Sequence, residues 1–297
     1  MAQVQISKVC GLCAGCKRSV DIATSSSKAH KTILYKEIVH NKNVNDILTN
    51  LGIKTINNLS DAKPDELIIL RAHGEPPETY EYLNSNKILF KDCTCPNVTK
   101  IHEQVKEYSD NGFMVVLIGK YGKNSGKVHP EVLGTIGWCA NNPILIEDTD
   151  DLHKLQDVKN TKLFLICQTT FNESKADSLI DSISQLCIDN SNHLIINKSI
   201  CSAQKSINLA SINLAKECDI MIVVGGKNSS NSIELFNNVK QYTKSIFIED
   251  ILAWKDELAS QNIPFSETTK FGLTAGASTL KEELVTLKTL IETELSQ

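Results

Sequence analysis

The stretch VCGLCAGCKRSV, residues 9–20, carries three cysteines, Cys10, Cys13 and Cys16, at C-x2-C-x2-C spacing. The same spacing opens the cluster-binding loop of bacterial ferredoxins. If all three cysteines bind one metal centre, the chain is an electron carrier or sensor. If only one of them does, the chain is of the kind that does chemistry on a substrate. The rest of the sequence distinguishes these two interpretations.

A short β-rich run, a cysteine and a helical pattern follow one another three times along the chain. The β-rich runs end in Cys13, Cys95 and Cys201 and read VQISKVCGLC (4–13), KILFKDCTC (87–95) and HLIINKSIC (193–201). Apolar spacing predicts a helix after each of these cysteines. Two further strands are then expected in each copy, and each of them ends in a polar loop. The first loops are VHNKN (39–43), HPEV (129–132) and KNSSNS (227–232), and the second begin within RAHG (71–74), CQTT (167–170) and TAGAST (274–279).

Alternating strands and helices predict an α/β fold with parallel sheets. The repeat divides the chain into three α/β units, residues 1–87, 88–192 and 193–297. Ligands of open α/β sheets bind beyond the carboxyl ends of the strands, which is where the polar loops fall. We therefore expect a three-lobed body whose polar loops converge on one centre.

Only the middle cysteine of the opening stretch recurs in the repeat. The positions equivalent to Cys10 hold Asp92 and Lys198, and those equivalent to Cys16 hold Val98 and Gln204. Cys16, Val20 and Ala23 share helical spacing, so Cys16 is expected on a buried helix face. The sequence also lacks the nearby fourth Cys followed by Pro that a ferredoxin loop requires. One ligand from each unit is the interpretation that fits best.

Three thiolates, each at a helix start where the helix dipole favours the charged form, make a metal site with an open position. A cubane iron–sulfur cluster held by three cysteines leaves one iron open to a substrate oxygen. Zinc with three cysteines is the competing metal. Three buried thiols without a metal are a further alternative. A saturated cluster with Cys10, Cys16 or Cys93 as fourth ligand would be a carrier or sensor.

The polar loops carry groups suited to phosphate oxygens. These are His40, His73, His129, Asn41, Thr169, Ser229, Ser230, Asn231 and Ser278. Arg71 and Lys227 are candidates for added positive charge, and the other four histidines are expected at the surface or in helices. Glu131, the carboxylate of the HPEV loop, is either a proton donor or a helix N-terminal residue stabilised by the dipole.

Composition argues against a nucleic-acid-binding, a membrane-spanning and a secreted protein. The chain has 297 residues and a net charge of −4, which gives no overall basic footprint for nucleic acid. It has no run of 18 apolar residues and no apolar signal core, so neither a membrane span nor secretion is expected. Ten cysteines in a chain expected in the cytoplasm point to metal or redox chemistry for some of them rather than to disulfides.

The motifs CAG, VHN, RAHG, TCPNVTKIH, HPEVLGTIG, CQTT, GGKNSSNS and TAGAST occur in this order along almost the whole chain. In this it closely resembles the 4-hydroxy-3-methylbut-2-enyl diphosphate reductases, the IspH/LytB family. The resemblance implies a trefoil of three α/β units around a central [4Fe-4S] cluster. It also implies an oxidoreductase at the last step of the non-mevalonate isoprenoid pathway, which reductively dehydroxylates an allylic diphosphate to isopentenyl and dimethylallyl diphosphates.

The resemblance also implies roles for particular residues. Cys13, Cys95 and Cys201 would hold the cluster and leave one iron open. Glu131 would deliver protons with the help of Thr169. The substrate's diphosphate would bind to His40, His73, His129, Thr169, Ser229, Ser230, Asn231 and Ser278. Ferredoxin or flavodoxin would donate electrons, and the location would be the cytoplasm, or a plastid if a targeting segment was removed. A hydro-lyase with the same open iron, which needs no net electron input, remains the alternative enzyme.

Overall fold

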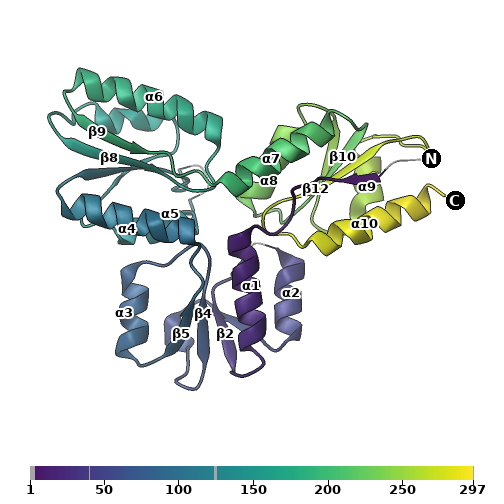
Figure 1. The fold of residues 1–297 in the computed structure, drawn as a ribbon, viewed down its shortest axis with the longest axis horizontal. Helices are drawn as coiled ribbons and strands as arrows, with labels where there is room; N and C mark the ends of the chain where they lie inside the picture. The colour runs from purple at the N-terminus through teal and green to yellow at the C-terminus, as the bar shows by residue number, and fades with distance from the viewer. Residues whose placement is uncertain (1–3, 40, 124–125, 297) are drawn as a thin grey trace. The chain divides into compact units, whose positions relative to one another are not determined.

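The fold consists of three four-stranded parallel sheets with helices on their faces (Figure 1). The computed structural model describes residues 4–39, 41–123 and 126–296. In spatial order, one sheet contains β3 (Lys54–Ile56), β2 (Thr32–Tyr35), β4 (Leu67–Leu70) and β5 (Leu89–Asp92). The next contains β7 (Ile144–Ile146), β6 (Met114–Ile118), β8 (Lys162–Cys167) and β9 (His193–Asn197). The last contains β11 (Lys244–Ile248), β10 (Ile220–Val224), β12 (Phe271–Ala275) and β1 (Val4–Ile6).

The three sheets share one topology, which confirms the predicted α/β repeat. In each, the two central strands are the ones that precede the polar loops, and one edge strand leads toward a cysteine of the repeat. That edge strand, β5, β9 or β1, pairs in parallel with β4, β8 or β12 respectively. Each cysteine therefore follows a strand that lies next to a strand with a polar loop.

The sheets are not divided in the same way as the sequence repeat. Strand β5 falls inside residues 88–192 of the repeat but pairs with β4, and β9 falls inside 193–297 but pairs with β8. A parallel strand joins its neighbour through a crossover helix, so the natural partner of β5 is the strand just before its own crossover. The predicted units 1–87, 88–192 and 193–297 thus describe the sequence repeat, whereas each sheet is completed by a strand from the adjoining copy.

The chain forms two compact units. The first unit comprises Met1–Thr24, Val39–Ile53 and Ser202–Gln297 and contains the sheet with β1, β10, β11 and β12. The second unit comprises Ser25–Ile38 and Lys54–Cys201 and contains the other two sheets. Over the described ranges, no helix combines the length and the apolar character that crossing a membrane requires.

Ten α-helices and three short 3₁₀ helices are found in the described residues. The α-helices are α1 (Ala14–Ser26), α2 (Lys42–Asn50), α3 (Pro77–Ser85), α4 (Pro96–Asp110), α5 (Pro130–Gly137), α6 (Glu173–Asp189), α7 (Ser202–Ala215), α8 (Ser230–Val239), α9 (Trp254–Ser260) and α10 (Lys281–Glu294). The 3₁₀ helices are η1 (Leu59–Asp61), η2 (Thr149–Leu155) and η3 (Ile251–Ala253). Proline at the first position starts α3, α4 and α5, where its missing N–H leaves no hydrogen bond unmade.

Alternate residues of the central strands pack against helices on opposite faces of the sheet. In β10, Met221 and Val223 contact α7 and α8, whereas Ile222 lies in the cluster of α9 and α10. In β8, Phe164 packs with α4, and Leu165 packs with α6. Burial on both faces explains why these strands read as continuous apolar runs.

Candidate active site

Each of the three repeated cysteines lies immediately before a helix, as the sequence predicts. Cys13 precedes α1, Cys95 precedes α4 and Cys201 precedes α7. All three side chains are half-buried. Their backbone N–H groups point to equivalent acceptors: Cys13 to the Ala277 carbonyl at 3.1 Å, Cys95 to Ala72 at 3.0 Å and Cys201 to Thr169 at 2.8 Å.

These acceptors occupy one position of the repeat. Each is the second residue after the end of a central strand, because β4 ends at Leu70, β8 at Cys167 and β12 at Ala275. The acceptor is Thr169 itself in one copy and the residue before His73 or Ser278 in the others. The hydrogen bond therefore fixes every repeated cysteine beside a polar loop that carries a predicted substrate-binding residue.

Cys13 has the environment of a thiolate. The Cys16 side chain hydrogen-bonds the Cys13 thiol and lowers the pKa of Cys13 to about 6, although partial burial opposes this shift. The backbone N–H of Cys16 also donates to the Cys13 sulfur, at 3.4 Å. Cys16, Val20 and Ala23 were predicted to share a buried face of this helix. Ala23 is fully buried, whereas Cys16 and Val20 are only half-buried.

In the second unit, Asn97 connects two of the predicted ligands, because it lies two residues after Cys95 and its side-chain amide donates to the Cys201 sulfur at 3.5 Å. Among the described residues, no three His, Cys, Asp or Glu side chains are grouped around a possible metal position. The donor set nevertheless suits iron and sulfide, since thiolates at helix starts are the usual ligands of such clusters.

The other cysteines near the repeat are less suited to bind metal. Cys93 and Cys167 are fully buried, and burial raises the pKa of Cys167 to about 12. The Cys10 thiol donates to the Ser7 carbonyl at 3.2 Å, and burial raises its pKa. Thiols that keep their proton are poor ligands because the thiolate is the binding form.

Glu131 and Thr169 form an enclosed polar contact in the second unit. The Thr169 N–H donates to Glu131 Oε1 at 2.6 Å, and the Thr169 hydroxyl donates to Oε2 at 2.8 Å. Glu131 is 2% exposed and Thr169 is 5% exposed. Burial raises the pKa of Glu131 to about 7 despite the opposing effect of both hydrogen bonds. The carboxyl can therefore hold or release a proton near neutral pH.

His129 and His73 lie next to each other in the same unit. Their ring centroids are 5.6 Å apart in an edge-to-face arrangement. His129 caps α5, and its Nδ1 accepts from the Glu131 N–H at 3.2 Å. An accepting Nδ1 places the proton of a neutral imidazole on Nε2, so Nε2 is then a hydrogen-bond donor. Two of the three predicted diphosphate histidines are thus brought together.

The remaining predicted site residues belong to the first unit. Asn41 caps α2 and Ser229 caps α8, and both are buried, as is Ser278. Asn231 has a buried side-chain oxygen without a hydrogen-bond partner, which is what a residue kept for a polar ligand would show. His40 and the side chain of Ser230 lie outside the described part of the structure.

Arg71 is not a source of free positive charge, contrary to the expectation from sequence. Its Nε lies 2.6 Å from Glu75 Oε1, and both side chains are buried. The carboxylate neutralises the guanidinium because an unpaired buried charge would be far more costly. Lys227 is exposed.

His102 was expected at the surface or in a helix, and it is a buried helix residue. It lies in α4 but is 4% exposed and stacks on Trp138, with ring centroids 5.5 Å apart. Burial lowers the pKa of His102 to about 4, so the ring is neutral. A Cβ on Gly74, which has φ +78°, would come within 2.5 Å of this ring. The glycine after His73 is therefore needed for both the turn and the close approach.

Gln168 is a site residue that sequence reasoning missed. It is 1% exposed, and its Oε1 accepts from the Lys120 N–H at 2.9 Å while its Nε2 donates to the Thr170 hydroxyl at 2.7 Å. The Lys120 carbonyl in turn accepts from the His129 N–H at 2.9 Å. Gln168 thereby connects the chain before His129 with the turn that contains Thr169. Its position in CQTT was the only available signal.

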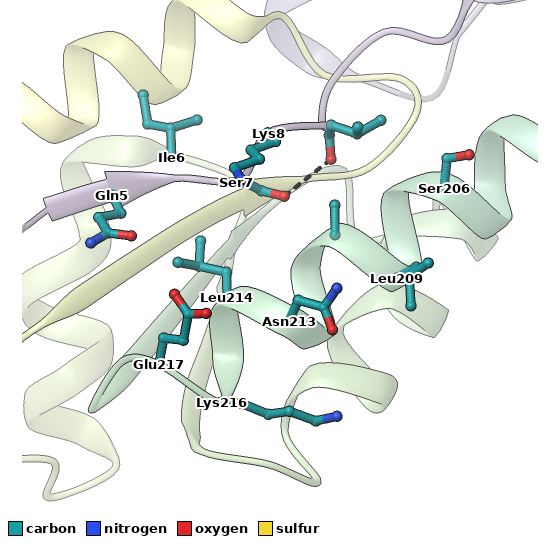
Figure 2. Close-up of a pocket in the computed structure, with 12 residues that line it drawn as sticks. Gln5, Ile6, Ser7, Lys8, Ser206, Leu209, Asn213, Leu214, Lys216 and Glu217 are labelled. Carbon is teal, nitrogen blue, oxygen red and sulfur yellow. Dashed lines mark hydrogen bonds between the residues drawn. The ribbon is translucent and has the colours of Figure 1, made fainter.

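A groove of about 610 Å³ lies between β1 and α7 in the first unit (Figure 2). It is lined by Ser7, whose hydroxyl donates to the Val9 carbonyl, and by Leu209 and Asn213 of α7. None of its lining residues is a predicted site residue. This groove is therefore separate from the polar groups described above.

Comparisons with known proteins agree on one family. The family model described as LytB protein matches residues 4–291. The 4-hydroxy-3-methylbut-2-enyl diphosphate reductase of Clostridioides difficile (strain 630) is 33% identical over 288 residues, which cover 95% of this chain and 98% of that protein.

Two solved structures are similar over nearly the whole chain. One is (E)-4-hydroxy-3-methyl-but-2-enyl diphosphate reductase, the terminal enzyme of the non-mevalonate pathway, with 28% identity, a TM-score of 0.72, and coverage of 99% of this chain and all of that chain. The other is E-1-hydroxy-2-methyl-but-2-enyl-4-diphosphate reductase from Plasmodium falciparum, with 26% identity, a TM-score of 0.84, and coverage of 97% of this chain and 87% of that one.

Proposed function

We propose, from the premise that this chain belongs to the LytB protein family, that it is a 4-hydroxy-3-methylbut-2-enyl diphosphate reductase. The observation that carries the proposal is the buried Glu131–Thr169 pair, whose carboxyl titrates near neutral pH. Reductive dehydroxylation removes the allylic hydroxyl as water. It consumes two electrons and two protons and gives isopentenyl or dimethylallyl diphosphate. A buried proton donor is what this reaction requires from the protein.

The cysteines proposed to hold a [4Fe-4S] cluster are Cys13, Cys95 and Cys201. The lowered pKa of Cys13 and the helix starts at all three positions support them as thiolate ligands. A bound cluster with three cysteine ligands would pass on the electrons for the reduction and would offer one Lewis-acidic iron. Of the three candidate fourth ligands, Cys10 has a hydrogen-bonded thiol and Cys93 is fully buried, which argues against both. The third candidate is Cys16, whose side chain hydrogen-bonds Cys13.

The diphosphate is proposed to bind through hydrogen-bond donors of the polar loops. His73 and His129 present neighbouring rings, and the Nε2–H of His129 is a suitable donor. The other proposed contacts are His40, Thr169, Ser229, Ser230, Asn231 and Ser278. Because Arg71 is neutralised by Glu75, hydrogen bonds rather than a free arginine account for the anion's recognition in the second unit.

Glu131 is proposed to deliver the proton that leaves with the hydroxyl as water. Its enclosure keeps the carboxyl protonated up to about pH 7, and Thr169 holds both oxygens in place. The Thr169 hydroxyl also holds a proton that can follow the one that Glu131 gives up. The Thr169 carbonyl binds the Cys201 N–H, so the proton donor and a proposed iron ligand are fixed to one residue.

The electron donor is proposed to be a ferredoxin- or flavodoxin-type protein, because the reaction consumes electrons that this chain cannot supply itself. The cytoplasm is the proposed location. The bacterial relative, whose cells contain no plastids, supports the cytoplasm over a plastid.

The decisive test is an iron Mössbauer titration of anaerobically reconstituted protein with 4-hydroxy-3-methylbut-2-enyl diphosphate. The proposal expects about one iron in four to change its signal, since one iron lacks a cysteine ligand. If no iron responds, a fourth thiolate closes the cluster and the chain is a carrier or sensor. Product analysis with and without a reductant separates the reductase from a hydro-lyase, which would form product without electrons.

A further inference from the structure

Cys13 and Cys16 form a C-x-x-C pair at the start of a helix. Cys13 precedes α1, and Cys16 lies in its first turn. The Cys16 N–H donates to the Cys13 sulfur at 3.4 Å, so that sulfur lies over the turn that carries Cys16. Residues three apart on a helix have Cβ atoms about 5–6 Å apart, and a disulfide needs about 3.5–4.5 Å. Because Cys13 precedes the helix, a small backbone adjustment at Cys13 can close this difference. Thiol–disulfide oxidoreductases place their cysteines in this way.

Cys10 has the same spacing from Cys13 but not the same geometry. Its thiol donates to the Ser7 carbonyl at 3.2 Å and packs against the apolar cluster of β1, α9 and α10. Cys13 packs instead against the cluster that contains Ile207 and Ala277. The two side chains thus face different parts of the core. The structure favours Cys16 over Cys10 as the partner of Cys13.

The second thiol occurs in one copy of the repeat only. The residues three positions after Cys95 and Cys201 are Val98 and Gln204, both buried. All ten cysteines belong to the described part of the chain, and none forms a disulfide in this structure. Cys13 is therefore the only one of the three repeated cysteines with a thiol at this position.

We propose that Cys13 and Cys16 are a reversible redox site, which forms an intramolecular disulfide when Cys13 holds no iron. The disulfide itself does not rest on the proposed function, but its effect on iron loading does. When Cys13 holds no iron, the disulfide with Cys16 removes its thiolate, and the protein cannot bind iron there again until the disulfide is reduced.

The oxidant is a low-molecular-weight disulfide such as oxidised glutathione. The Cys13 thiolate attacks one sulfur, the glutathione disulfide bond breaks, and one glutathione thiolate leaves. The Cys16 thiolate then attacks the Cys13 sulfur of the mixed disulfide and expels the second glutathione. The two cysteines lose two electrons and two protons in total, and oxidised glutathione becomes two thiols. A dithiol reverses both steps.

The test uses the full chain, stripped of iron by a chelator under argon and equilibrated with oxidised glutathione. Remaining thiols are alkylated, and trypsin releases residues 9–17, which contain all three cysteines. The expected peptide carries one alkyl group, on Cys10, and is lighter by the mass of two hydrogen atoms than its reduced form with the same single label. Tandem mass spectrometry locates the label. A label on Cys16, or three labels, would overturn the proposal.

Variants provide the matched controls. Cys16→Val introduces the residue found at the same position of the second copy, and Cys16→Ser keeps its polarity. Both are expected to abolish the internal disulfide and to leave Cys13 joined to glutathione. Cys10→Ala is expected to keep the disulfide. An internal disulfide that survives Cys16→Val but is lost in Cys10→Ala would assign the pair to Cys10 and contradict the inference.

Iron loading gives a second readout. After oxidation, the wild-type chain is expected to lose most of its iron-binding capacity and to recover it with dithiothreitol, and Cys10→Ala, which keeps the disulfide, is expected to lose and recover it in the same way. Unchanged iron loading of oxidised wild type, in a sample whose mass spectrum shows the disulfide, would refute the link to the metal centre. If no form of the chain binds iron, the proposed function fails, and the mass spectra still decide whether the disulfide exists.

Discussion

Thr169 holds both oxygens of the Glu131 carboxyl, one through its backbone N–H at 2.6 Å and the other through its hydroxyl at 2.8 Å. Hydrogen bonds to a carboxylate lower its pKa, whereas loss of water raises it. For Glu131, at 2% exposure, the second effect is larger, and the pKa rises to about 7. The contact therefore orients a carboxyl that is poised to donate a proton at neutral pH.

Replacing Glu131 with Gln should nearly abolish turnover without removing the metal centre. Gln keeps the shape and can accept from the Thr169 N–H, but it has no acidic proton. General acid catalysis contributes about 10²–10⁴-fold, so the rate is expected to fall by that factor. Iron and sulfide contents and the visible spectrum should match the wild type. Near-normal turnover would rule out Glu131 as the proton donor.

The pH profile should identify the same carboxyl. If reaction requires protonated Glu131, the rate falls as pH rises above about 7. The Thr169 hydroxyl lowers the pKa of Glu131, so Thr169→Val should raise it and move the fall to higher pH, by about one unit for a charge-assisted hydrogen bond. Initial rates across the neutral range measure this shift.

Thr135 provides the matched control for that experiment. Its hydroxyl donates to the backbone carbonyl of Glu131 at 2.8 Å and does not bind the carboxyl. Thr135→Val removes a buried hydroxyl from the same helix, so it should leave the pH profile in place. Equal shifts in the two variants would attribute the effect to general loosening of α5.

The sequence was sufficient to predict the parts of this protein that repeat. Parallel strands buried on both faces read as apolar runs, and each repeated cysteine precedes a helix at the predicted place. The recurring hydrogen bond from each cysteine to the loop of a neighbouring strand was not predictable. It depends on strand order, and β5 and β9 pair across the boundaries of the sequence repeat.

Contacts formed in the folded chain account for what the sequence did not show at single residues. Arg71 reads as a free cation in a loop, but Glu75 four residues later neutralises it in the folded chain. His102 has no local pattern that marks it as buried, because its stacking partner Trp138 lies 36 positions away in the chain. Gln168 binds the backbone N–H of Lys120. Every residue except proline has this group, so the identity of residue 120 does not reveal the contact.

Gln168→Leu should misplace the Glu131 segment without changing its chemistry. Leu leaves the Lys120 N–H without its acceptor, and a buried unsatisfied donor costs about 1–3 kcal/mol of stability. Small misplacement of a reacting group reduces kcat by about tenfold to a hundredfold. The apparent pKa of the rate profile should stay unchanged, because Gln168 does not touch the carboxyl.

Gln185→Leu is the control for Gln168→Leu. Gln185 makes an exposed hydrogen bond with Asp189 on α6, so both stability and kcat should stay at the wild-type level. A Gln168→Leu enzyme with unchanged kcat would show that the contact with Lys120 does not position the site. A shifted pKa would mean that Gln168 acts on Glu131 directly.

Arg71→Met should destabilise the second unit strongly. It leaves the buried Glu75 carboxylate with Lys36, whose Nζ is 3.5 Å from Oε2, as the remaining ion-pair partner in the described residues. Removing one member of a buried ion pair costs about 3–5 kcal/mol. Arg71→Met with Glu75→Leu should recover part of this loss, since no charge is then stranded. Urea unfolding of the single and double variants measures both effects.

The exposed pair of Lys106 and Asp110 is the comparison for Arg71→Met. Lys106 Nζ lies 2.7 Å from Asp110 Oδ2, and both side chains are about half exposed to water. Such helix-surface pairs contribute about 0.3–0.5 kcal/mol, so Lys106→Met should be nearly neutral. Equal losses in Arg71→Met and Lys106→Met would mean that burial of the Arg71–Glu75 pair has no energetic consequence.

Stability should depend on pH through Glu131. Its folded pKa, about 7, lies above the ordinary glutamate value of 4.5, so the folded chain keeps a proton that the unfolded chain releases between these values. Stability linked to this proton is therefore full below about pH 4.5 and is lost as pH rises through 7, by on the order of 3 kcal/mol. Glu131→Gln cannot ionise and should lack this loss.

The free energies of unfolding of wild type and Glu131→Gln should consequently diverge as pH rises, with the variant gaining relative stability between about pH 5 and 8. Urea titrations of both chains, in the same metal state at each pH, give the difference directly. Effects of the substitution on packing do not depend on pH and only displace the curve. A difference that stays constant across this range would show that the Glu131 carboxyl ionises at its ordinary pKa and that burial does not hold its proton.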